Sequence, residues 1–287
     1  EIDIERYQEI KLESVRQQLL KLIKNVLIEL VNRCGNKEGN LHKFSDRLKD
    51  SDTVLTFNWD ILLDEILSRK NILNSDFRHI HKYKGYKNFF VKLSAHRLSF
   101  SDEVGIEEPY SIYDNKTGYY LKLHGSIDWV YCNNEQCLGF GEGFPIEKID
   151  QQHFCSKCHE LMHPLIIPPV LNKQYRKFPL IRRLWNIALK ETESVEEIVI
   201  WGYSLPETDF YSMWLLKNAR RNLKTLTLIN PGVIQGKREK RINKNFVERF
   251  SNIYKNVIEK DTIDLYEIFE DFLNDNDVYK KYGIKRQ

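Results

Sequence analysis

The sequence predicts an α/β fold: a Rossmann-like, doubly wound parallel sheet that carries a small zinc-ribbon and helical insert. Three observations support this fold class. Two apolar strands flank a helical stretch over residues 196–232, several strands end in polar or glycine-containing turns, and two pairs of cysteines interrupt the pattern. Uninterrupted apolar strands are typical of parallel sheets that are covered on both faces.

The composition is that of a folded protein with nearly balanced charge. Its 287 residues are 41% hydrophobic and 12% aromatic, which is enough for a sizeable core and excludes a disordered chain. The net charge of +3 argues against a dedicated nucleic-acid binder, so nucleic acid is expected only as an indirect partner. No apolar run reaches the roughly 18 residues of a membrane span, and no signal peptide is recognisable. We therefore expect a cytoplasmic protein with no membrane partner.

The N-terminal part of the chain is expected to be helical. Residues 7–31 carry polar side chains at every third or fourth position, which is typical of a helix that packs through one face. A loop over 34–40 and a short helix over 41–50 follow. Because the chain begins with Glu1 and contains methionine only at internal positions, we expect the natural protein to have a segment upstream.

Polar side chains stand at the end of the first predicted strand, which covers residues 54–59. Asn58 and Asp60 follow apolar residues there. Buried polar groups cost free energy unless they are paired, so a strand that ends in this way commonly ends at a binding site. Asp60 also suits the N-cap of a helix over 61–70. Residues 71–118 are predicted to form a helical or irregular insert.

The next predicted strand, 119–124, ends at His124-Gly125-Ser126 and leads into a cysteine-rich insert over 132–163. The pattern C-x4-C, a gap of 17 residues and C-x2-C is formed by Cys132, Cys137, Cys155 and Cys158. This spacing suits four thiolates that converge tetrahedrally on zinc. Disulfides are the alternative, which the unpaired fifth cysteine, Cys34, and the lack of secretory features disfavour. A four-sulfur site is closed to substrate, so this zinc would be structural.

The C-terminal part shows the clearest alternation of strands and helices. Pro179 stands at a tolerated first-turn position of a predicted helix. The predicted segments are a helix over 179–192, a strand over 196–205, a helix over 208–222, a strand over 223–232, a helix over about 243–258, a short strand within 262–268 and a helix over about 265–274. They predict a core formed by residues 1–131 and 164–287, with its N-terminal part missing from this chain.

Residues far apart in the sequence are expected to line one crevice. In a doubly wound sheet, ligands bind outside the carboxyl ends of the strands. The predicted strand ends carry Asn58 and Asp60, His124-Gly125-Ser126, Gly202-Tyr203-Ser204 and Asn230. A single buried histidine or asparagine is more often a satisfied core residue, whereas four such ends at one edge indicate a binding site.

These residues resemble the motifs of one known family, the sirtuin-like proteins. "TFNWD" (56–60) resembles their Thr-x-Asn-x-Asp motif, and "LHGS" (123–126) resembles their catalytic His-Gly, with the cysteine pairs directly after it. "GYSL" (202–205) resembles their Gly-x-Ser strand end, and "IN" (229–230) the asparagine that meets the adenosine ribose. "HGSIDW" and "GYSLPETD" are most similar to a divergent prokaryotic branch, whose members often serve in anti-phage defence and degrade NAD.

The resemblance implies an NAD glycohydrolase, which cleaves the nicotinamide–ribose bond and releases nicotinamide and ADP-ribose. Asn58 would position the nicotinamide ribose and the attacking water, and His124 would act as general base. The cofactor-binding residues that it implies are Thr56, Asp60, Gly125, Gly202, Ser204 and Asn230. NAD is then a substrate, and a protein partner or a homo-oligomer is expected to control the activity.

The sequence departs from the family pattern in three places. The glycine-rich phosphate-binding loop that precedes the Asn motif is absent, and the expected upstream segment would supply it. Phe57 stands where protein deacylases have Gln, and "IIPPVLNK" (166–173) replaces their Phe-Gly-Glu stretch. Two alternatives therefore stay open: an NAD-dependent protein deacylase, and a non-catalytic sensor or scaffold that binds NAD or ADP-ribose.

Overall fold

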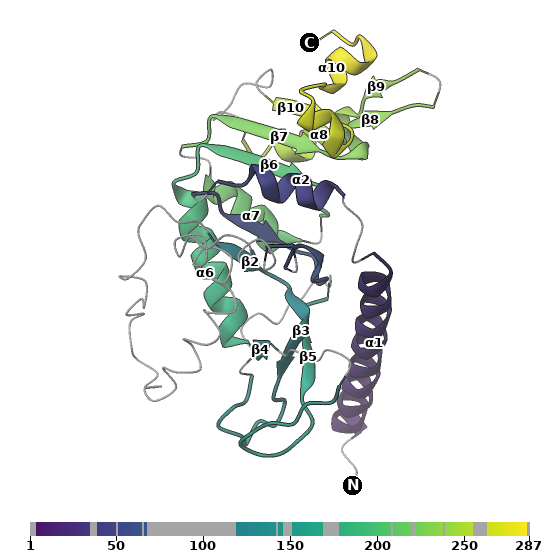
Figure 1. The fold of residues 1–287 in the computed structure, drawn as a ribbon. Coiled ribbons are helices and arrows are strands. Elements are labelled where there is room, and N and C mark those ends of the chain that lie inside the picture. The colour runs from purple at the N-terminus through teal and green to yellow at the C-terminus, as the bar shows by residue number, and fades with distance from the viewer. Residues whose placement is uncertain are drawn as a thin grey trace. The chain divides into compact units, whose positions relative to one another are not determined.

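The computed structural model describes residues 4–34, 39–49, 51–64, 66–67, 119–141, 143–145, 151–168, 178–207, 209–219, 222–237, 239–254 and 263–285. These residues form helices, parallel strand pairs and a separate antiparallel sheet (Figure 1). The predicted α/β class with parallel strands is confirmed. The predicted insert at 71–118 lies outside the described residues.

The chain divides into two compact units. The first comprises Glu1–Pro168 and Gln174–Leu184, and the second comprises Pro169–Lys173 and Trp185–Gln287. The predicted boundaries of core and inserts, at 131/132 and 163/164, stay a prediction.

In the first unit, β1 (Val54–Thr56) pairs in parallel with β2 (Tyr120–Lys122). The predicted strand 54–59 is therefore too long. It ends at Thr56, because the Asn58 N–H turns back to the Thr56 side-chain oxygen, at 3.1 Å. The prediction that this strand is buried is also wrong, since all of β1 is only partly buried.

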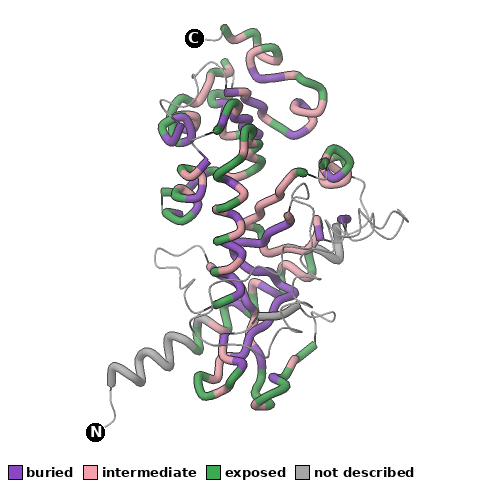
Figure 2. The backbone as a smooth tube through the Cα atoms, turned by 90° about the vertical axis from the view of Figure 1, so that its left-hand side faces the viewer, coloured by how far each residue is buried: buried purple, intermediate pink, exposed green. Residues whose placement is uncertain are grey.

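The centre of the first unit is an antiparallel sheet with the order β4-β3-β5. Its strands are β3 (Gly125–Tyr131), β4 (Gly143–Pro145) and β5 (His163–Ile166). Every residue of β3 is buried, whereas β5 is buried only in its second half; Figure 2 shows buried residues in purple. Sequence reasoning missed β3. Its polar residues Ser126 and Asp128 are buried as well, so the strand lacks the alternation of exposed polar and buried apolar residues that would reveal it.

Two helices precede these strands: α1 (Ile4–Cys34) and α2 (Asn40–Arg47). Both were predicted. Leu20 of α1 is buried in a cluster with Ile127 of β3 and Ile166 of β5, so α1 packs on the antiparallel sheet through one face. This confirms the prediction of a packing helix.

The second unit contains a three-stranded parallel sheet with the order β10-β7-β6. Its strands are β6 (Glu197–Trp201), β7 (Thr225–Ile229) and β10 (Ile263–Tyr266). The helix α7 (Phe210–Asn218) connects β6 to β7, which confirms the predicted strand–helix–strand unit. The prediction that both strands are buried holds for β7 only. In β6, Val199 and Trp201 are 51% and 37% exposed; the exposed residues alternate along the strand, so they lie on one of its faces.

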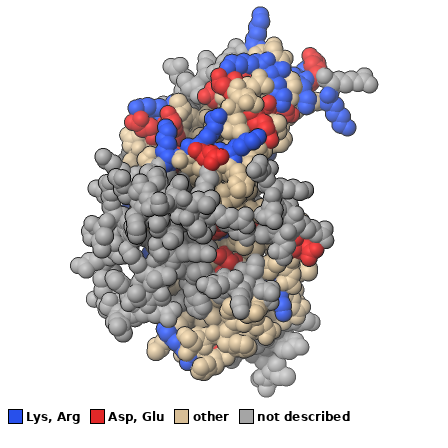
Figure 3. Space-filling model, viewed as in Figure 1, with Lys and Arg blue, Asp and Glu red and all other residues tan. Residues whose placement is uncertain are grey.

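The remaining described elements complete the two units. They are α6 (Pro179–Glu193), η4 (Pro231–Val233), β8 (Ile234–Gln235), β9 (Arg241–Ile242), α8 (Lys244–Ser251), α9 (Phe269–Leu273) and α10 (Val278–Tyr282). Helix α6 begins at Pro179 as predicted. On the face that Figure 3 shows, basic and acidic side chains are interspersed over the second unit. Among the described helices, none combines the length and apolarity that crossing a membrane requires.

Candidate functional site

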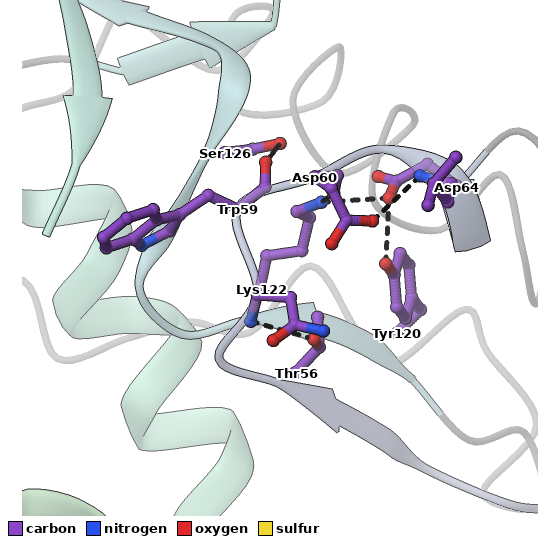
Figure 4. A network of polar contacts seen from close by, with 9 residues as sticks. Thr56, Trp59, Asp60, Asp64, Tyr120, Lys122 and Ser126 are labelled. Atoms are coloured by element: carbon purple, nitrogen blue, oxygen red, sulfur yellow. Dashed lines mark hydrogen bonds and ion pairs between the residues drawn. The ribbon is translucent and has the colours of Figure 1, made fainter. Parts of the chain in front are cut away.

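The first candidate site is the turn of residues 57–60, which follows β1. Its backbone is held by the neighbouring strand β3: the Trp59 carbonyl accepts the Ile127 N–H at 2.9 Å and the Ser126 hydroxyl at 3.3 Å (Figure 4). The Asn58 N–H donates to the Thr56 hydroxyl at 3.1 Å. Asn58 itself is exposed. The turn therefore presents the Asn58 side chain to solvent on a fixed backbone.

The end of the same turn is fixed by charged side chains. One Asp60 carboxylate oxygen accepts the Leu62 N–H at 3.1 Å, so Asp60 caps the helical segment that begins there, which is the structural role considered for it in the sequence. The Asp60 carbonyl accepts a hydrogen bond from the Lys122 ammonium. That ammonium also forms an ion pair of 2.9 Å with Asp64, whose same oxygen accepts the Tyr120 hydroxyl at 2.9 Å (Figure 4).

His124 lies in the turn between β2 and β3, beside this first turn. It is 5% exposed, and its ring centroid is 5.0 Å from that of Phe57, the residue that precedes Asn58. Backbone hydrogen bonds hold residues 123 and 124 in place: the Leu123 N–H donates to the Thr56 carbonyl, and the Ile167 N–H donates to the His124 carbonyl. The structure thus brings the imidazole to the turn that carries Asn58.

Gly125 has a structural reason to be glycine. Its φ is +79°, and a Cβ atom there would lie 2.0 Å from the Leu165 carbonyl oxygen of β5. A side chain would meet backbone, which cannot move aside. The close approach of β3 and β5 therefore requires this glycine, whatever part it has in binding NAD.

The four predicted zinc ligands converge in the first unit. The sulfur atoms of Cys132, Cys137, Cys155 and Cys158 all lie within 4.8 Å of one another. The Cys132–Cys158 and Cys137–Cys155 sulfur pairs are 3.6 and 3.8 Å apart, much longer than the roughly 2.0 Å of a disulfide. Zn–S bonds of about 2.3 Å in a tetrahedron place sulfurs about 3.8 Å apart. The cluster therefore fits a structural zinc ion, and the disulfide alternative is excluded for these cysteines.

The backbone around the sulfurs also suits metal binding. The Gly139 N–H donates to the Cys137 sulfur at 3.3 Å, and the Lys157 N–H donates to the Cys155 sulfur at 3.5 Å. Burial raises the pKa of Cys132 to about 12. Burial acts in the same direction on Cys155, but N–H groups of Cys158 and Lys157 outweigh it and lower the pKa of Cys155 to about 7. The metal-ligating group that the described residues form consists of cysteines alone.

The predicted binding residues of the second unit lie at neighbouring strand ends. Gly202 follows β6 with φ +74°, and its N–H donates to the Ile229 carbonyl of β7 at 2.9 Å. Asn230 follows β7; its side-chain amide donates to the Tyr203 carbonyl at 3.5 Å, and its side-chain oxygen accepts the Gly232 N–H at 2.7 Å. The structure brings Asn230 to the Gly202–Ser204 turn, where Ser204 is exposed.

The motif "GYSLPETD" also has an internal explanation. The Tyr203 hydroxyl donates to a carboxylate oxygen of Asp209 at 2.8 Å, and the other oxygen of Asp209 caps α7 by accepting the Ser212 N–H. Burial, reinforced by the Asp209 charge, raises the pKa of Tyr203, so this hydroxyl stays protonated and remains a donor. Tyr203 and Asp209, near the two ends of the motif, are therefore linked by a hydrogen bond that stabilises its conformation.

Sequence reasoning missed Lys122, Asp64 and Tyr120. Lys122 was visible as a polar residue of a predicted strand, and a lysine flanked by apolar residues on a buried strand needs a counter-charge. Asp64 stands four residues after Asp60, which is one helical turn. These two signals mark Lys122 and Asp64 as notable residues, whereas their pairing follows from the register of β1 and β2.

No protein-family model matches the chain, and no curated protein matches it. Among solved structures, the chain is similar to Sir2 proteins at low sequence identity. A Sir2 crystal structure with the inhibitor EX-527, 2'-O-acetyl-ADP-ribose and a deacetylated p53 peptide is 13% identical, with a TM-score of 0.41; the match covers 87% of this chain and 74% of that chain. A Sir2 homologue bound to NAD is 15% identical, with a TM-score of 0.35 and coverage of 76% and 64%. A Sir2 point mutant with a p53 peptide and NAD is 11% identical, with a TM-score of 0.39 and coverage of 90% and 79%.

Proposed function

We propose that this chain belongs to an NAD-consuming hydrolase that releases nicotinamide and ADP-ribose. The observation that carries this proposal is the juxtaposition in the first unit: the ring of His124 packs against Phe57, directly before the exposed Asn58, on a turn whose backbone is held by hydrogen bonds. An amide and an imidazole on two adjacent turns are the groups that hydrolysis of a nucleoside-type bond needs.

The proposed chemistry resembles glycoside hydrolysis. Cleavage of the nicotinamide–ribose bond passes through an oxocarbenium-like centre, which a positioned water attacks. Asn58 would hold the ribose and orient this water. His124 would accept a proton from the water or from a ribose hydroxyl, which is the role that histidine most often has in general acid–base catalysis. Thr56 and Asp60 would support this turn, in line with the hydrogen bonds that their side chains accept from Asn58 and Leu62.

The second unit is proposed to bind the nucleotide. Gly202 and Ser204 would approach the phosphates or the adenosine ribose, and Asn230 the adenine ribose. Support comes from the exposure of Ser204 and from the left-handed backbone at Gly202, around which a Cβ atom would find no heavy atom within 4 Å. This open backbone leaves room for a ligand.

The zinc site would hold structure and do no chemistry, since four sulfurs complete its coordination shell. Its ligand Cys132 directly follows β3, the strand that begins beside His124. A role in anti-phage defence, a cytoplasmic location and control by a partner protein or by assembly into a homo-oligomer are part of the proposal, and the family resemblance of the motifs supports them.

One assay separates the three candidate functions. The native full-length protein is incubated with NAD, with and without an acyl-lysine peptide, and nicotinamide release is measured together with NAD binding. Peptide-independent release is expected. Release that requires the peptide would identify a deacylase, and binding without release would identify a sensor. Phe57 favours the hydrolase, because the protein deacylases among the sirtuin-like proteins have Gln at this position.

A further inference from the structure

Lys122 is an ammonium buried in the core of the first unit. The residue is 1% exposed, and its ion pair with Asp64 joins side chains that are 0% and 6% exposed. Burial of two charges is costly, and an apolar pair of similar volume often gives equal or higher stability. Stability alone therefore does not account for a lysine at this position.

The pair is also incompletely satisfied. One carboxylate oxygen of Asp64 accepts both Lys122 and Tyr120, while the other is buried without a hydrogen-bond partner. A buried polar atom without a partner costs about 1–3 kcal/mol. The arrangement therefore fixes the position of the ammonium, although it lowers the stability of the fold.

That position is defined by the turn of residues 57–60. In the register of the parallel pair, Lys122 lies opposite Thr56, the last residue of β1. Its side chain extends along the turn to the Asp60 carbonyl, as Figure 4 shows. Lys122 therefore connects both sides of Asn58: its backbone pairs with the strand end before it, and its ammonium bonds to the helix start after it.

We propose that Lys122 is a positioning residue for the reaction, and that it fixes the Asn58 turn through the Asp60 carbonyl while its ion pair with Asp64 holds its ammonium in place. This inference rests on the proposed function. Hydrogen bonds from an ammonium are stronger than neutral ones, so the Asp60 carbonyl is held firmly. A displacement of catalytic groups by about 1 Å can cost about 100-fold in rate.

The test replaces the charged group by an apolar one that keeps the fold. The variant combines Lys122→Met, Asp64→Leu and Tyr120→Phe, so that no buried charge remains unpaired. Tyr120→Phe alone is the matched control, because it leaves the bond from Lys122 to the Asp60 carbonyl intact. Three quantities are measured on the native full-length protein: the unfolding temperature, amide hydrogen exchange, and kcat and KM for NAD.

The triple variant is expected to unfold at or above the wild-type temperature. The Leu62 and Ile127 amides, which donate to Asp60 and Trp59 of the turn, are expected to exchange at least about 10-fold faster, and kcat to fall about 100-fold with little change in KM. The Tyr120→Phe control is expected to behave as wild type. A folded triple variant with wild-type protection of both amides would overturn the proposal.

The exchange measurement separates this inference from the proposed function. If the wild-type protein does not turn over NAD, the proposed function fails, and amide exchange still decides whether Lys122 holds the turn. Should the triple variant not fold, Lys122→Arg is the second variant. Its guanidinium keeps the charge beside Asp64 but is larger and planar, so it cannot donate to the Asp60 carbonyl in the same geometry. The same losses are expected, and wild-type exchange and turnover in Lys122→Arg would overturn the proposal.

Discussion

Lys122 lies opposite Thr56 in the β1–β2 pair, yet its ammonium bonds to the carbonyl of Asp60, four residues further along the opposing chain. This contact spans the turn that carries Asn58. The end of one strand is thereby linked to the start of the following helical segment by a side chain from its neighbour. The C-terminal half of the turn is held by this link at Asp60 and by β3 at the adjacent Trp59.

Removal of the proposed general base is expected to stop the reaction. His124→Ala should lower kcat for NAD hydrolysis by about 100- to 10,000-fold, because a positioned general base contributes that much. Nicotinamide release is the measurement. His42→Ala, which removes a half-buried histidine of α2, is the control and should retain full activity. Hydrolysis by His124→Ala at the wild-type rate would refute the assigned role.

Removal of the proposed positioning amide should have a similar effect on kcat. Asn58→Ala deletes an exposed side chain without removing a contact that holds the turn, since the backbone N–H makes the bond to Thr56. The unfolding temperature should therefore stay within a few degrees of wild type, while nicotinamide release falls by at least about 100-fold. An active Asn58→Ala protein would show that another group positions the water.

One zinc ion per chain is expected in the native protein. Native mass spectrometry should detect it, and Cys155→Ser should lose it, because thiolate ligands account for the affinity. Cys34→Ser is the matched control, since Cys34 is the fifth cysteine and does not belong to the cluster. A metal-free wild-type protein with four reactive thiols would contradict the prediction.

Glycine substitutions should separate backbone strain from a steric clash. Both Gly125 and Gly202 have a left-handed φ, but only at Gly125 would a Cβ atom meet backbone, 2.0 Å away at Leu165. Gly202→Ala should cost about 1–2 kcal/mol in the free energy of unfolding. Gly125→Ala should cost clearly more, and chemical denaturation measures both. Equal losses would show that the β3–β5 contact relaxes readily.

The C-terminal ion-pair network predicts sensitivity to acid. Hydrogen bonds from Lys281 and Tyr282 lower the pKa of Glu267. A carboxylate whose pKa is lower in the folded state contributes stability above its unfolded pKa of about 4.3, and this contribution disappears as the pH falls through the folded pKa. Glu267→Gln should therefore lower the unfolding temperature at pH 7 and have a smaller effect near pH 3. A constant difference between the two proteins at all pH values would rule out this linkage.

Local patterns predicted much of the fold, because they depend on neighbours in sequence. The start of α6 at Pro179 and the strand β7 follow from such patterns, and the spacing of the cysteines predicted a cluster that the sulfur distances support. The exposure of β6 could not be predicted, since an uninterrupted apolar run does not show that one face of the strand is left uncovered. Strand β3 was missed because both of its faces are buried.

The candidate site was only partly predictable for the same reason. The polar residues at strand ends are visible in the sequence, and the structure brings His124 to Phe57 and Asn230 to Tyr203. The contacts from Lys122 to Asp60 and Asp64 join residues that are 62 and 58 positions apart, and they depend on the register of β1 and β2. Local sequence patterns do not determine that register.

The tight contact at Gly125 gives the two residues of the His-Gly pair different meanings in a homologue of unknown activity. A homologue that has lost catalysis would still need glycine after the histidine, because its two strands would collide otherwise. The contact between these strands does not require a histidine before the glycine. Retention of the glycine therefore indicates an intact scaffold, and under the proposed function only the histidine would distinguish an active homologue from an inactive one.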